Sequence, residues 1–543
     1  MTYLVGTFDI LSGLFRVRNL RLSPLMQVLP GAVTASFAAS IITGVLLIPL
    51  AHGLRRRKQR AWRVAVVLLA VSTASALLRF EILHPLLAGG LLLALILTRA
   101  QFQALGDPTT RWRAVRVFVI LAAVDVLVGL AVVHSARHSM LPGSPSISVY
   151  LQQVLVGLVG LDGPIVFSSA RVGDIVGMAL GGLGLTTGLV TAYFALRAPE
   201  PRGELTTEDE VQLRQLLGGS PDSLGYFNLR RDKSVIWSDT GKAAVAYRVV
   251  GGVMLASGDP VGDPEAWSGA IRAFLDEARR HAWTPAVIGC SERAGTAWTR
   301  MGDLTAMEIG DEAVLETATF SMQGRPMRNV RQMVSRIRRA GYETEVCRVR
   351  DLAPETRQTV LADAATWRSS ETERGFSMAL GRTADPADPD AVLVTARQDG
   401  VVRGLLQFVP WGSDGMSLDL MRRDSAADAG INELLITAAM DAAPGLGVGR
   451  VSLNFAAFRE VFERGEKLGA GPFVRAFRAM LLFASRWFQL ESLYRFNAKF
   501  NPTWQPRYLI YPGTADLPRV GVAVLEAEAF IVWPTFRRFQ EAQ

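Results

Sequence analysis

Residues 391–409 read AVLVTARQDGVVRGLLQFV, two apolar runs separated by the pair Asp399-Gly400. An Asp-Gly pair between apolar runs is typical of a β-hairpin, because both residues tolerate the positive φ angles that a tight hairpin turn requires. We therefore predict antiparallel strands over 391–396 and 401–409. This hairpin decides the fold class, because antiparallel strands surrounded by helical runs indicate an α/β (α+β) domain.

The elements on either side of the hairpin extend the pattern. Strands are predicted at 343–349, 416–421 and 451–455, and helices at 354–367 and 431–440. An earlier region repeats the order loosely, with strands at 234–238, 243–250, 253–257 and 286–289, further strands near Met307 and Ala313, and helices at 265–281 and 295–301. The repetition suggests tandem acyltransferase-like domains, although other α+β folds share this order of elements.

The domain boundaries follow from composition. Residues 198–210, APEPRGELTTEDE, change abruptly from apolar to Pro, Gly and acidic residues, which predicts a linker followed by a helix capped by Thr206 or Thr207. We expect the first α/β domain over 211–322, the second over 323–543, and a membrane domain over 1–197.

Charge and hydropathy separate the first 200 residues from the rest. Of the 543 residues 49% are hydrophobic, and mean hydropathy is +0.22. Residues 1–200 carry 17 Lys and Arg against 7 Asp and Glu, whereas residues 201–543 carry 41 and 43. The net positive charge therefore lies beside the apolar segments of residues 1–200, which argues against a freely soluble enzyme and against a uniformly basic nucleic-acid wrapper.

About five apolar segments of the membrane domain predict a multi-pass protein of the cell membrane. They lie at 32–54, 64–78, 82–98, 117–133 and 174–196, and the broken stretch 140–161 is a possible sixth, which would change the side of the N-terminus. Basic clusters at 55–60 and 99–116 indicate cytoplasmic loops under the positive-inside rule. This topology places the α/β domains in the cytoplasm.

Cysteine and histidine content excludes several kinds of site. The chain contains only Cys290 and Cys347, too few for a disulfide framework or a cysteine-based zinc site. Among five histidines only His281 lies beyond the apolar region, so a zinc site or a Ser-His-Asp triad is poorly supplied. We predict no metal site.

Several motifs of the α/β region resemble those of the aminoacyl-phosphatidylglycerol synthases, the multiple peptide resistance factor family. They are DKSV at 232–235, GDPVGD at 258–263, ERGFSMALGR at 373–382, SLDLMRR at 417–423, YRFNAKF at 494–500 and WQPRY at 504–508. The similarity runs over residues 205–535 and is greatest to the lysyl-phosphatidylglycerol synthase portion of actinobacterial enzymes that are fused to a lysyl-tRNA synthetase.

The resemblance implies two GNAT-like folds behind membrane helices and transfer of an aminoacyl group, lysyl by this likeness, from charged tRNA to the hydroxyl of phosphatidylglycerol. Because no synthetase follows residue 543, we expect a separate lysyl-tRNA synthetase to supply the donor. The membrane domain is smaller than the flippase domain of the longest relatives, so we do not expect lipid flipping. Another amino acid or lipid acceptor stays open.

The chemistry agrees with this expectation. Aminoacyl-tRNA already carries an activated ester, so the reaction needs no cofactor and no covalent intermediate, only orientation, one proton transfer and stabilisation of one oxyanion.

The resemblance assigns the catalytic residues. It implies that Asp419 and Arg422 belong to the active site, where we expect Asp419 to hold the α-ammonium group and Arg422 to contact a lipid or tRNA phosphate; the alternative is an ion pair at the end of a strand. Glu373 is expected to accept a proton or to bind the cationic amino acid.

Three further residues are candidates for substrate binding. Lys499 and Arg507 suit phosphate or oxyanion contact, unless they belong to a solvated basic tail. Asn454 is expected to orient the ester carbonyl, or else to be a buried amide satisfied by the backbone.

Two basic stretches are candidates for surface contacts. The acid-free segment 325–341 places apolar residues at helical spacing and leaves the arginines exposed, which favours tRNA contact over an ordinary solvated face. These arginines are Arg328, Arg331, Arg336, Arg338 and Arg339. Segment 473–500 mixes aromatic residues and arginines, as a membrane-surface helix or a core helix does.

Two other functions compete with aminoacyl transfer. A membrane-anchored acetyltransferase that uses acetyl-CoA would need a glycine-rich loop for the pyrophosphate, but the corresponding stretch, RRDSAADAG at 422–430, is acidic and has one glycine. A transporter or interaction protein would have no need of Asp419.

Overall fold

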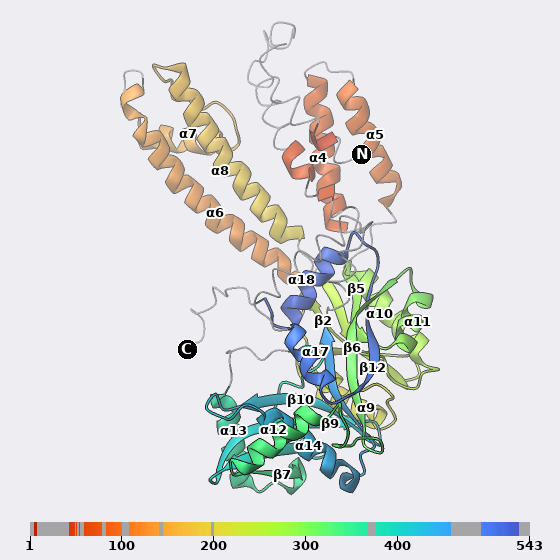
Figure 1. Cartoon of the computed structure of the whole chain (residues 1–543). Helices are drawn as coiled ribbons and strands as arrows, with labels where there is room; N and C mark the ends of the chain where they lie inside the picture. The colour runs from red at the N-terminus through yellow and green to blue at the C-terminus, as the bar shows by residue number, and fades with distance from the viewer. Residues whose placement is uncertain are drawn as a thin grey trace. The chain divides into compact units, whose positions relative to one another are not determined.

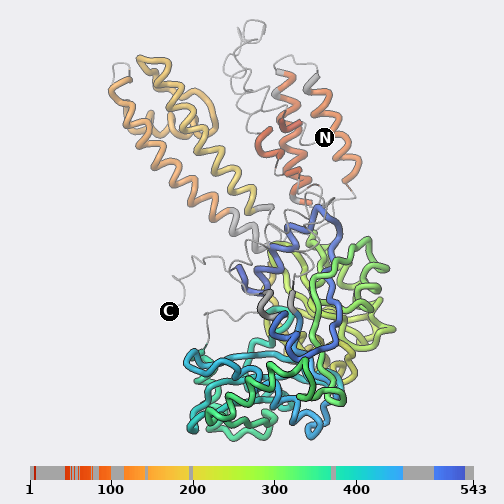
Figure 2. Tube along the Cα trace, in the orientation of Figure 1, coloured from red at the N-terminus to blue at the C-terminus, as the bar shows by residue number. Residues whose placement is uncertain are grey.

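The computed structural model of the chain describes residues 59–78, 83–99, 108–140, 145–196, 200–367, 375–457 and 490–531, together with short stretches at 5–7, 43–48, 50–51 and 54. The chain forms two compact units, one of residues Met1–Pro199 with Arg279–Ala282, the other of Glu200–Ala278 with Trp283–Gln543. The first is helical, and the second combines a sheet with helices (Figures 1 and 2).

The helical unit contains helices where four of the five spans are predicted. Its long elements are α4 (Gln59–Leu78), α5 (Leu83–Leu97), α6 (Pro108–Ser135), α7 (Ile147–Leu158) and α8 (Ala170–Leu196). α4 packs against α5, and α6 packs against α7 and α8. The predicted span at 32–54 lies largely outside the described residues.

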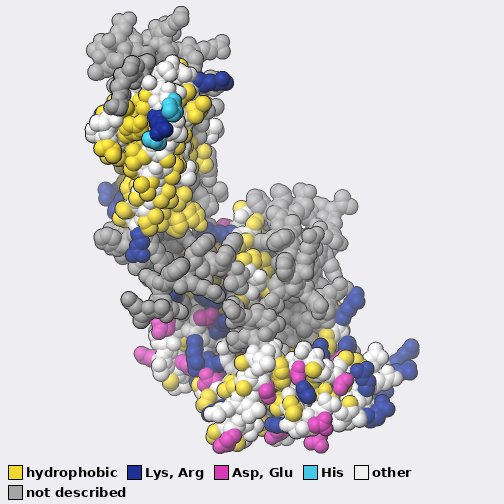
Figure 3. Space-filling model, turned by 90° about the vertical axis from the view of Figure 1, so that its left-hand side faces the viewer, with side chains coloured by type: hydrophobic (Ala, Val, Ile, Leu, Met, Phe, Trp, Pro, Cys, Tyr) yellow, Lys and Arg dark blue, Asp and Glu magenta, His cyan; other side chains and the backbone are white. Residues whose placement is uncertain are grey.

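Two helices of this unit are long and apolar enough to cross a membrane. Within the described residues these segments are Val115–Ser135 and Ala170–Phe194, and the remaining apolar helices are shorter. Large apolar side chains stand on their surfaces; Phe118, Leu127 and Met178 are each at least half exposed. The helical part of Figure 3 accordingly shows mostly hydrophobic side chains on the face in view.

Within the described residues, the α/β unit is built on one mixed sheet of twelve strands. Its strands are β1 (Ser234–Trp237), β2 (Ala243–Val250), β3 (Val253–Ser257), β4 (Val261–Gly262), β5 (Thr284–Cys290), β6 (Thr305–Glu316), β7 (Tyr342–Arg348), β8 (Val392–Gln398), β9 (Val401–Trp411), β10 (Gly415–Arg423), β11 (Arg450–Ala457) and β12 (Thr503–Tyr511). The order is β1-β2-β3-β5-β12-β6-β11-β10-β9-β8-β7, with β4 beside β2. The expected mixed α/β architecture is thus confirmed.

The opening hairpin forms as predicted. β8 and β9 pair antiparallel up to Gln398 and Val401, and the turn residues Asp399 and Gly400 have φ angles of 52° and 78°. The strands expected near Met307 and Ala313 are instead one continuous strand, β6.

The sheet has a first half, formed by β1 to β6 with β12, and a second half, formed by β7 to β11. Each half contains one parallel pair joined by a helix. β3 and β5 are connected through α10 (Trp267–His281), and β10 and β11 through α14 (Ile431–Ala442). The remaining neighbours in the sheet run antiparallel. This repeated arrangement agrees with two tandem α/β units.

Helices cover both faces of the second half. Val392 and Val394 of β8 face α14 and α12 (Arg328–Arg339), whereas Leu393 between them packs with α13 (Pro354–Thr366). This alternation follows from the two-residue period of a strand, and it buries an apolar strand on both sides.

The last strand of the described chain lies in the first half. β12 lies between β5 and β6, and α18 (Leu517–Ala527) packs on β2, β3 and β5 with Leu517, Val520 and Val524 in the core. Residues that follow the second half in sequence therefore complete the sheet and core of the first half (Figure 1).

Candidate active site

In the second half of the sheet, the parallel strands β10 and β11 are paired over only part of their described length. β10 and β11 are in register over three residue pairs, from Gly415 and Arg450 to Ser417 and Ser452, and no paired residues follow in these described strands. Beyond this point Asn454 adopts a positive φ of 67°. The strands therefore diverge beside residues 418–422, which carry the predicted catalytic pair.

Asp419 lies in a β-bulge of β10. The register against β9 shifts between Leu418 and Leu420, so that Asp419 and Leu420 both lie opposite Gln407. Its Oδ1 accepts the Leu380 backbone N–H at 2.6 Å, and its Oδ2 accepts Gln407 Nε2 at 2.5 Å. Bulges redirect a side chain and are frequent beside active sites. Here the bulge holds a carboxylate between two donors.

The GFS loop, residues 375–382, lies over this opening and is fixed from several elements. Glu528, only 1% exposed, accepts the backbone N–H groups of Phe376 and Ser377 at 2.7 and 2.9 Å. Arg230 donates to the carbonyls of Gly375 and Ala379 at 2.5 and 3.2 Å. Because its backbone groups are bonded to the buried Glu528 and the partly buried Arg230, the loop can present the Leu380 N–H to Asp419 in a fixed position.

Asn454 ties the loop to β10. Its Nδ2 donates to the carbonyls of Met378 and Leu418, both at 3.1 Å, and its Oδ1 accepts the Phe455 N–H at 2.9 Å. The nitrogen and the oxygen of the side-chain amide are therefore both hydrogen-bonded to the backbone. This agrees with the second alternative from the sequence, an amide satisfied by the backbone, and not with an amide that orients the ester carbonyl.

A buried carboxylate anchors the end of the loop. Asp388 is 2% exposed and accepts Arg382 at 2.5 and 2.9 Å, Arg214 at 2.9 Å and Tyr226 Oη at 2.9 Å. Burial alone would raise the pKa of Asp388, but hydrogen bonds and charge from Arg382 and Arg214 hold it below its usual value.

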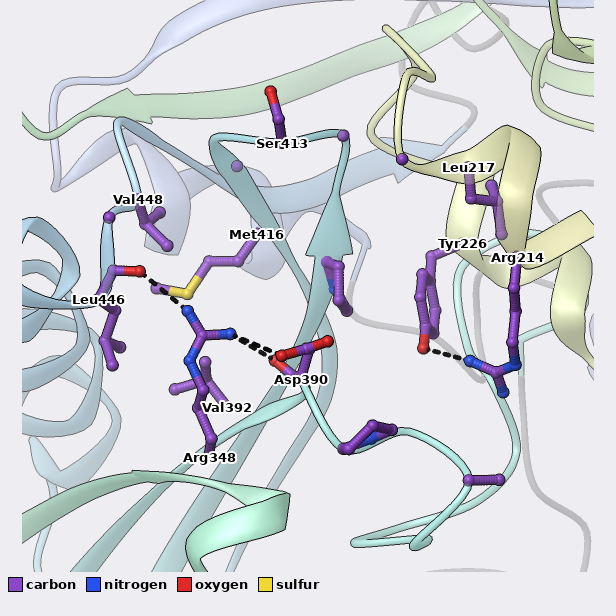
Figure 4. A pocket seen from close by; sticks show the side chains of 17 residues that line it. Arg214, Leu217, Tyr226, Arg348, Asp390, Val392, Ser413, Met416, Leu446 and Val448 are labelled. Atoms are coloured by element: carbon purple, nitrogen blue, oxygen red, sulfur yellow. Dashed lines mark hydrogen bonds and ion pairs between the residues drawn. The ribbon is translucent and has the colours of Figure 1, made fainter.

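A cavity of about 500 Å³ lies next to this cluster. Figure 4 shows Arg214 and Tyr226 on one side and Arg348 on the other, where Arg348 bonds the Leu446 carbonyl at 2.8 Å and pairs with Asp390. The residues predicted from the sequence are not among the described residues that line it.

A fully buried lysine lies beneath the GFS loop. Lys233 Nζ donates to Ser257 Oγ at 2.6 Å and to the Phe227 carbonyl at 3.0 Å, and it lies 4.5 Å from the centre of the Phe376 ring. Burial lowers the pKa of Lys233 to about 7, although the charge of Asp232 acts in the opposite direction.

This lysine predicts a pH dependence of stability. The unfolded amine titrates near pH 10.4, so between about pH 7 and 10 the unfolded state binds more protons and the free energy of unfolding rises with pH. We expect Lys233→Met to remove this contribution, at most about 1.4 kcal/mol per pH unit. Urea unfolding of the full chain in detergent at pH 7 to 9 measures how the free energy of unfolding changes with pH. The control Lys242→Met, at an exposed site, should keep the wild-type slope. An equal slope in the two variants would contradict the prediction.

The other predicted catalytic residues, and the predicted substrate-binding residue Lys499, have different positions. Arg422 is half-buried on β10 and donates to the Ala364 carbonyl of α13 at 2.6 Å. Glu373 lies outside the described residues. Lys499, 40% exposed, pairs with Glu433 at 2.8 Å. The structure thus brings Asp419, Asn454 and the GFS loop together, with Arg422 three residues further along β10.

Arg507 is buried in the first half of the sheet. It is 3% exposed and pairs with Asp222 at 2.7 Å and with Glu312 at 2.5 Å. It also donates to Ser223 Oγ at 2.6 Å, and Ser223 and Ser452 both donate to Glu312. Because its guanidinium is paired with carboxylates in the interior, Arg507 is better assigned to stabilising the interior of the first half than to substrate binding or a solvated tail.

The predicted basic helix forms as α12. Val330, Val334 and Ile337 are buried, while Arg328, Arg336, Arg338 and Arg339 are exposed. Arg331 differs, because it donates to the Met322 carbonyl at 2.5 Å and is half-buried.

The segment 473–500 is described only from residue 490, where α17 (Leu490–Ala498) contacts β11. The choice between a membrane-surface helix and a core helix therefore falls largely outside the described residues.

The acidic loop after β10 is held by its own residues. Asp424 accepts the Ala426 N–H at 2.9 Å and Arg403 at 2.7 Å, and the following helix starts after Gly430 at a φ of 109°. Glu433, 5% exposed, lies in the first turn of α14. A carboxylate there disfavours a bound pyrophosphate, in line with the argument against acetyl-CoA.

Residues that the sequence argument missed hold the site together. Gln407, Glu528 and Arg230 were not predicted, because their partners are distant in sequence. Gln407 alone gave a signal: it is the one polar residue in the run LLQFV at 405–409.

The α/β region matches a known family. Residues 214–511 match the family described as phosphatidylglycerol lysyltransferase, C-terminal. The chain is 41% identical over 502 residues to the lysylphosphatidylglycerol biosynthesis bifunctional protein LysX of Rhodococcus opacus, covering 90% of this chain and 44% of that one. It is 49% identical over 361 residues to LysX of Mycobacterium avium, covering 66% and 30%. The chain thus spans less than half the length of these curated relatives.

Solved structures share the fold. The structure of L-PGS from Bacillus licheniformis has a TM-score of 0.53 at 20% identity, covering 61% of this chain and 99% of that one. The C-terminal domain of a lysylphosphatidylglycerol synthetase from Agrobacterium fabrum has a TM-score of 0.51 at 22% identity, covering 60% and 98%. At 20% and 22% sequence identity, these two structures show only that the chain shares their fold.

Proposed function

The chain belongs to the phosphatidylglycerol lysyltransferase family, and on this premise we propose that it transfers a lysyl group from charged tRNA to phosphatidylglycerol. The observation that carries the proposal is the match over 214–511, which includes both halves of the sheet and the bulge that carries Asp419.

The proposed reaction is an acyl transfer between two oxygen atoms. The lipid hydroxyl oxygen attacks the ester carbonyl carbon of lysyl-tRNA and forms a new C–O bond. The C–O bond to the terminal ribose breaks, and the proton of the lipid hydroxyl ends on the ribose oxygen. No cofactor enters this balance, so the protein has only to align two substrates and to stabilise charge.

Asp419 is our candidate for holding the α-ammonium group. Both of its oxygens face N–H donors, an arrangement that suits the ionised carboxylate, and the GFS loop and β9 fix its direction. Arg422 is proposed for a lipid or tRNA phosphate because it lies on β10 three residues beyond Asp419, and a guanidinium binds phosphate through paired N–H donors. Glu373 remains our candidate for proton transfer or for binding the lysyl side chain.

We propose that the chain is a multi-pass protein of the cell membrane with its α/β unit in the cytoplasm. The two long apolar helices, the exposed apolar side chains and the basic residues at 99–116 support this placement. Anionic phosphatidylglycerol would then be supplied from the same membrane, and the partly exposed Lys499 is proposed to contact its phosphate.

The exposed arginines of α12 are proposed to bind tRNA phosphates. We expect the triple variant Arg328→Gln, Arg336→Gln, Arg339→Gln to raise KM for lysyl-tRNA about tenfold or more and to weaken its salt dependence, with little change in kcat. Transfer of radiolabelled lysine at several salt concentrations measures this.

The matched control removes three exposed arginines elsewhere in the unit, through Arg272→Gln, Arg300→Gln and Arg350→Gln. An equal rise of KM in this control would mean that net charge, and not α12, governs tRNA binding.

The function is tested on lipids. Cells that express the full chain should accumulate a ninhydrin-positive phospholipid, and mass analysis should identify it as lysyl-phosphatidylglycerol. The same extracts distinguish another amino acid or acceptor. If purified chain, lysyl-tRNA and phosphatidylglycerol vesicles yield no aminoacylated lipid, the proposal fails.

A further inference from the structure

We infer that Gln407 is a positioning residue for lysyl transfer, which fixes the Asp419 carboxylate through its amide; the inference rests on the function proposed above. Gln407 lies on β9, opposite the bulge, and is 1% exposed. A buried amide in an apolar run is costly unless it is hydrogen-bonded, so its partners indicate why this position is polar.

The partners of Gln407 determine which way its amide faces. Oε1 accepts the Ala384 backbone N–H at 2.7 Å, and Nε2 donates to the Arg382 carbonyl at 3.0 Å. A backbone N–H can only donate and a carbonyl can only accept, so the opposite orientation would place like groups together at both contacts. The group that faces Asp419 Oδ2 at 2.5 Å is therefore the NH₂ donor.

This orientation links Asp419 to a rigid part of the molecule. The carbonyl of Arg382 accepts from Gln407, and the guanidinium of Arg382 donates to Asp388. Arg214 and Tyr226 also donate to Asp388. Gln407 thus binds both ends of the backbone segment 382–384, and Asp388 holds the side chain of its first residue. The position of Asp419 Oδ2 is consequently set by Gln407 and the backbone that Gln407 binds, because rotation of the carboxylate would break this hydrogen bond.

The substitution Gln407→Glu tests the inference while keeping the shape of the side chain. One oxygen of the new carboxyl would accept from Ala384, and the other would face only acceptors, the Arg382 carbonyl and Asp419 Oδ2. The acid can replace the amide only while protonated; once ionised it repels Asp419, and two facing carboxylates share a proton to a higher pH than either alone.

We therefore expect kcat of Gln407→Glu to fall at least tenfold between pH 6.5 and 8, relative to the wild-type chain in phosphatidylglycerol vesicles with lysyl-tRNA. Gln398→Glu is the matched control, because Gln398 lies on β8 and its Nε2 also donates to a backbone carbonyl, that of Ala340. This control should follow the wild-type profile.

The outcomes separate the inference from its premise. A wild-type pH profile for Gln407→Glu, or a loss of activity that is equal at every pH, would mean that Gln407 has only a structural role. An active Gln407→Met variant with unchanged kcat would overturn the inference as well. Failure of the wild-type chain to make aminoacylated lipid would instead reject the proposed function.

Discussion

Replacing Asp419 by asparagine is expected to lower kcat/KM for lysyl transfer by about 100-fold or more. The substitution removes the negative charge that we assign to the α-ammonium group, and its NH₂ would face either the Leu380 N–H or the Gln407 amide, both of which are donors. Removal of one preorganised electrostatic contact typically costs this much in an acyl transfer. Initial rates of labelled lysine transfer into lipid measure the effect.

The control for this variant is Asp414→Asn in the β9–β10 turn, where the side chain is exposed and pairs with Arg450 at 3.0 Å. It should retain activity within about twofold, as exposed ion pairs contribute little. If Asp419→Asn is folded, as judged by its thermal unfolding, and keeps more than a tenth of wild-type activity, Asp419 is not the ammonium-binding group.

Replacing Arg507 by methionine is expected to cause the largest loss of stability. Asp222 and Glu312 would remain in the interior without their cation, and breaking a buried ion pair from one side typically costs about 3–5 kcal/mol. Burial and Asp222 already raise the pKa of Asp259, which Arg507 opposes. Without Arg507 the pKa of Asp259 should lie still further above its unfolded value, so stability should fall as pH rises.

Urea unfolding of the full chain in detergent at pH 5.5 and 7.5 measures this prediction, with the greater loss expected at pH 7.5. Low millimolar guanidinium should restore part of the stability, because it can occupy the vacated position. Arg350→Met, at a surface pair with Asp390, should cost less than about 1 kcal/mol. A similar cost in both variants would contradict a central role for Arg507.

Local patterns predicted most of the fold. The hairpin at Asp399-Gly400 and the bounds of β2 and β3 agree with the sequence, because turn chemistry and apolar runs act over a few residues. Two strands were predicted in place of β6 because Asp311 and Glu312 interrupt its apolar pattern. The structure explains the interruption: Glu312 is fully buried as the partner of Arg507.

The candidate site was predictable only in part. Asp419 was found by resemblance, but its bulge and its two donors depend on pairing with β9 and on a loop forty residues earlier. Arg507 was expected at a phosphate because it belongs to a basic motif, and nothing local reveals the carboxylates around it. Contacts between distant segments carry no signature in a single stretch of sequence.

The position of β12 has a consequence for biosynthesis. When strands β1 to β6 have left the ribosome, the strand that lies between β5 and β6 has not yet been made, because residues 503–511 are translated about 190 residues after β6 ends. The facing edges of β5 and β6 therefore stay unpaired until residue 511 has emerged. Such edges are prone to aggregation during synthesis, so production of this chain should depend on chaperones and tolerate truncation before residue 511 poorly.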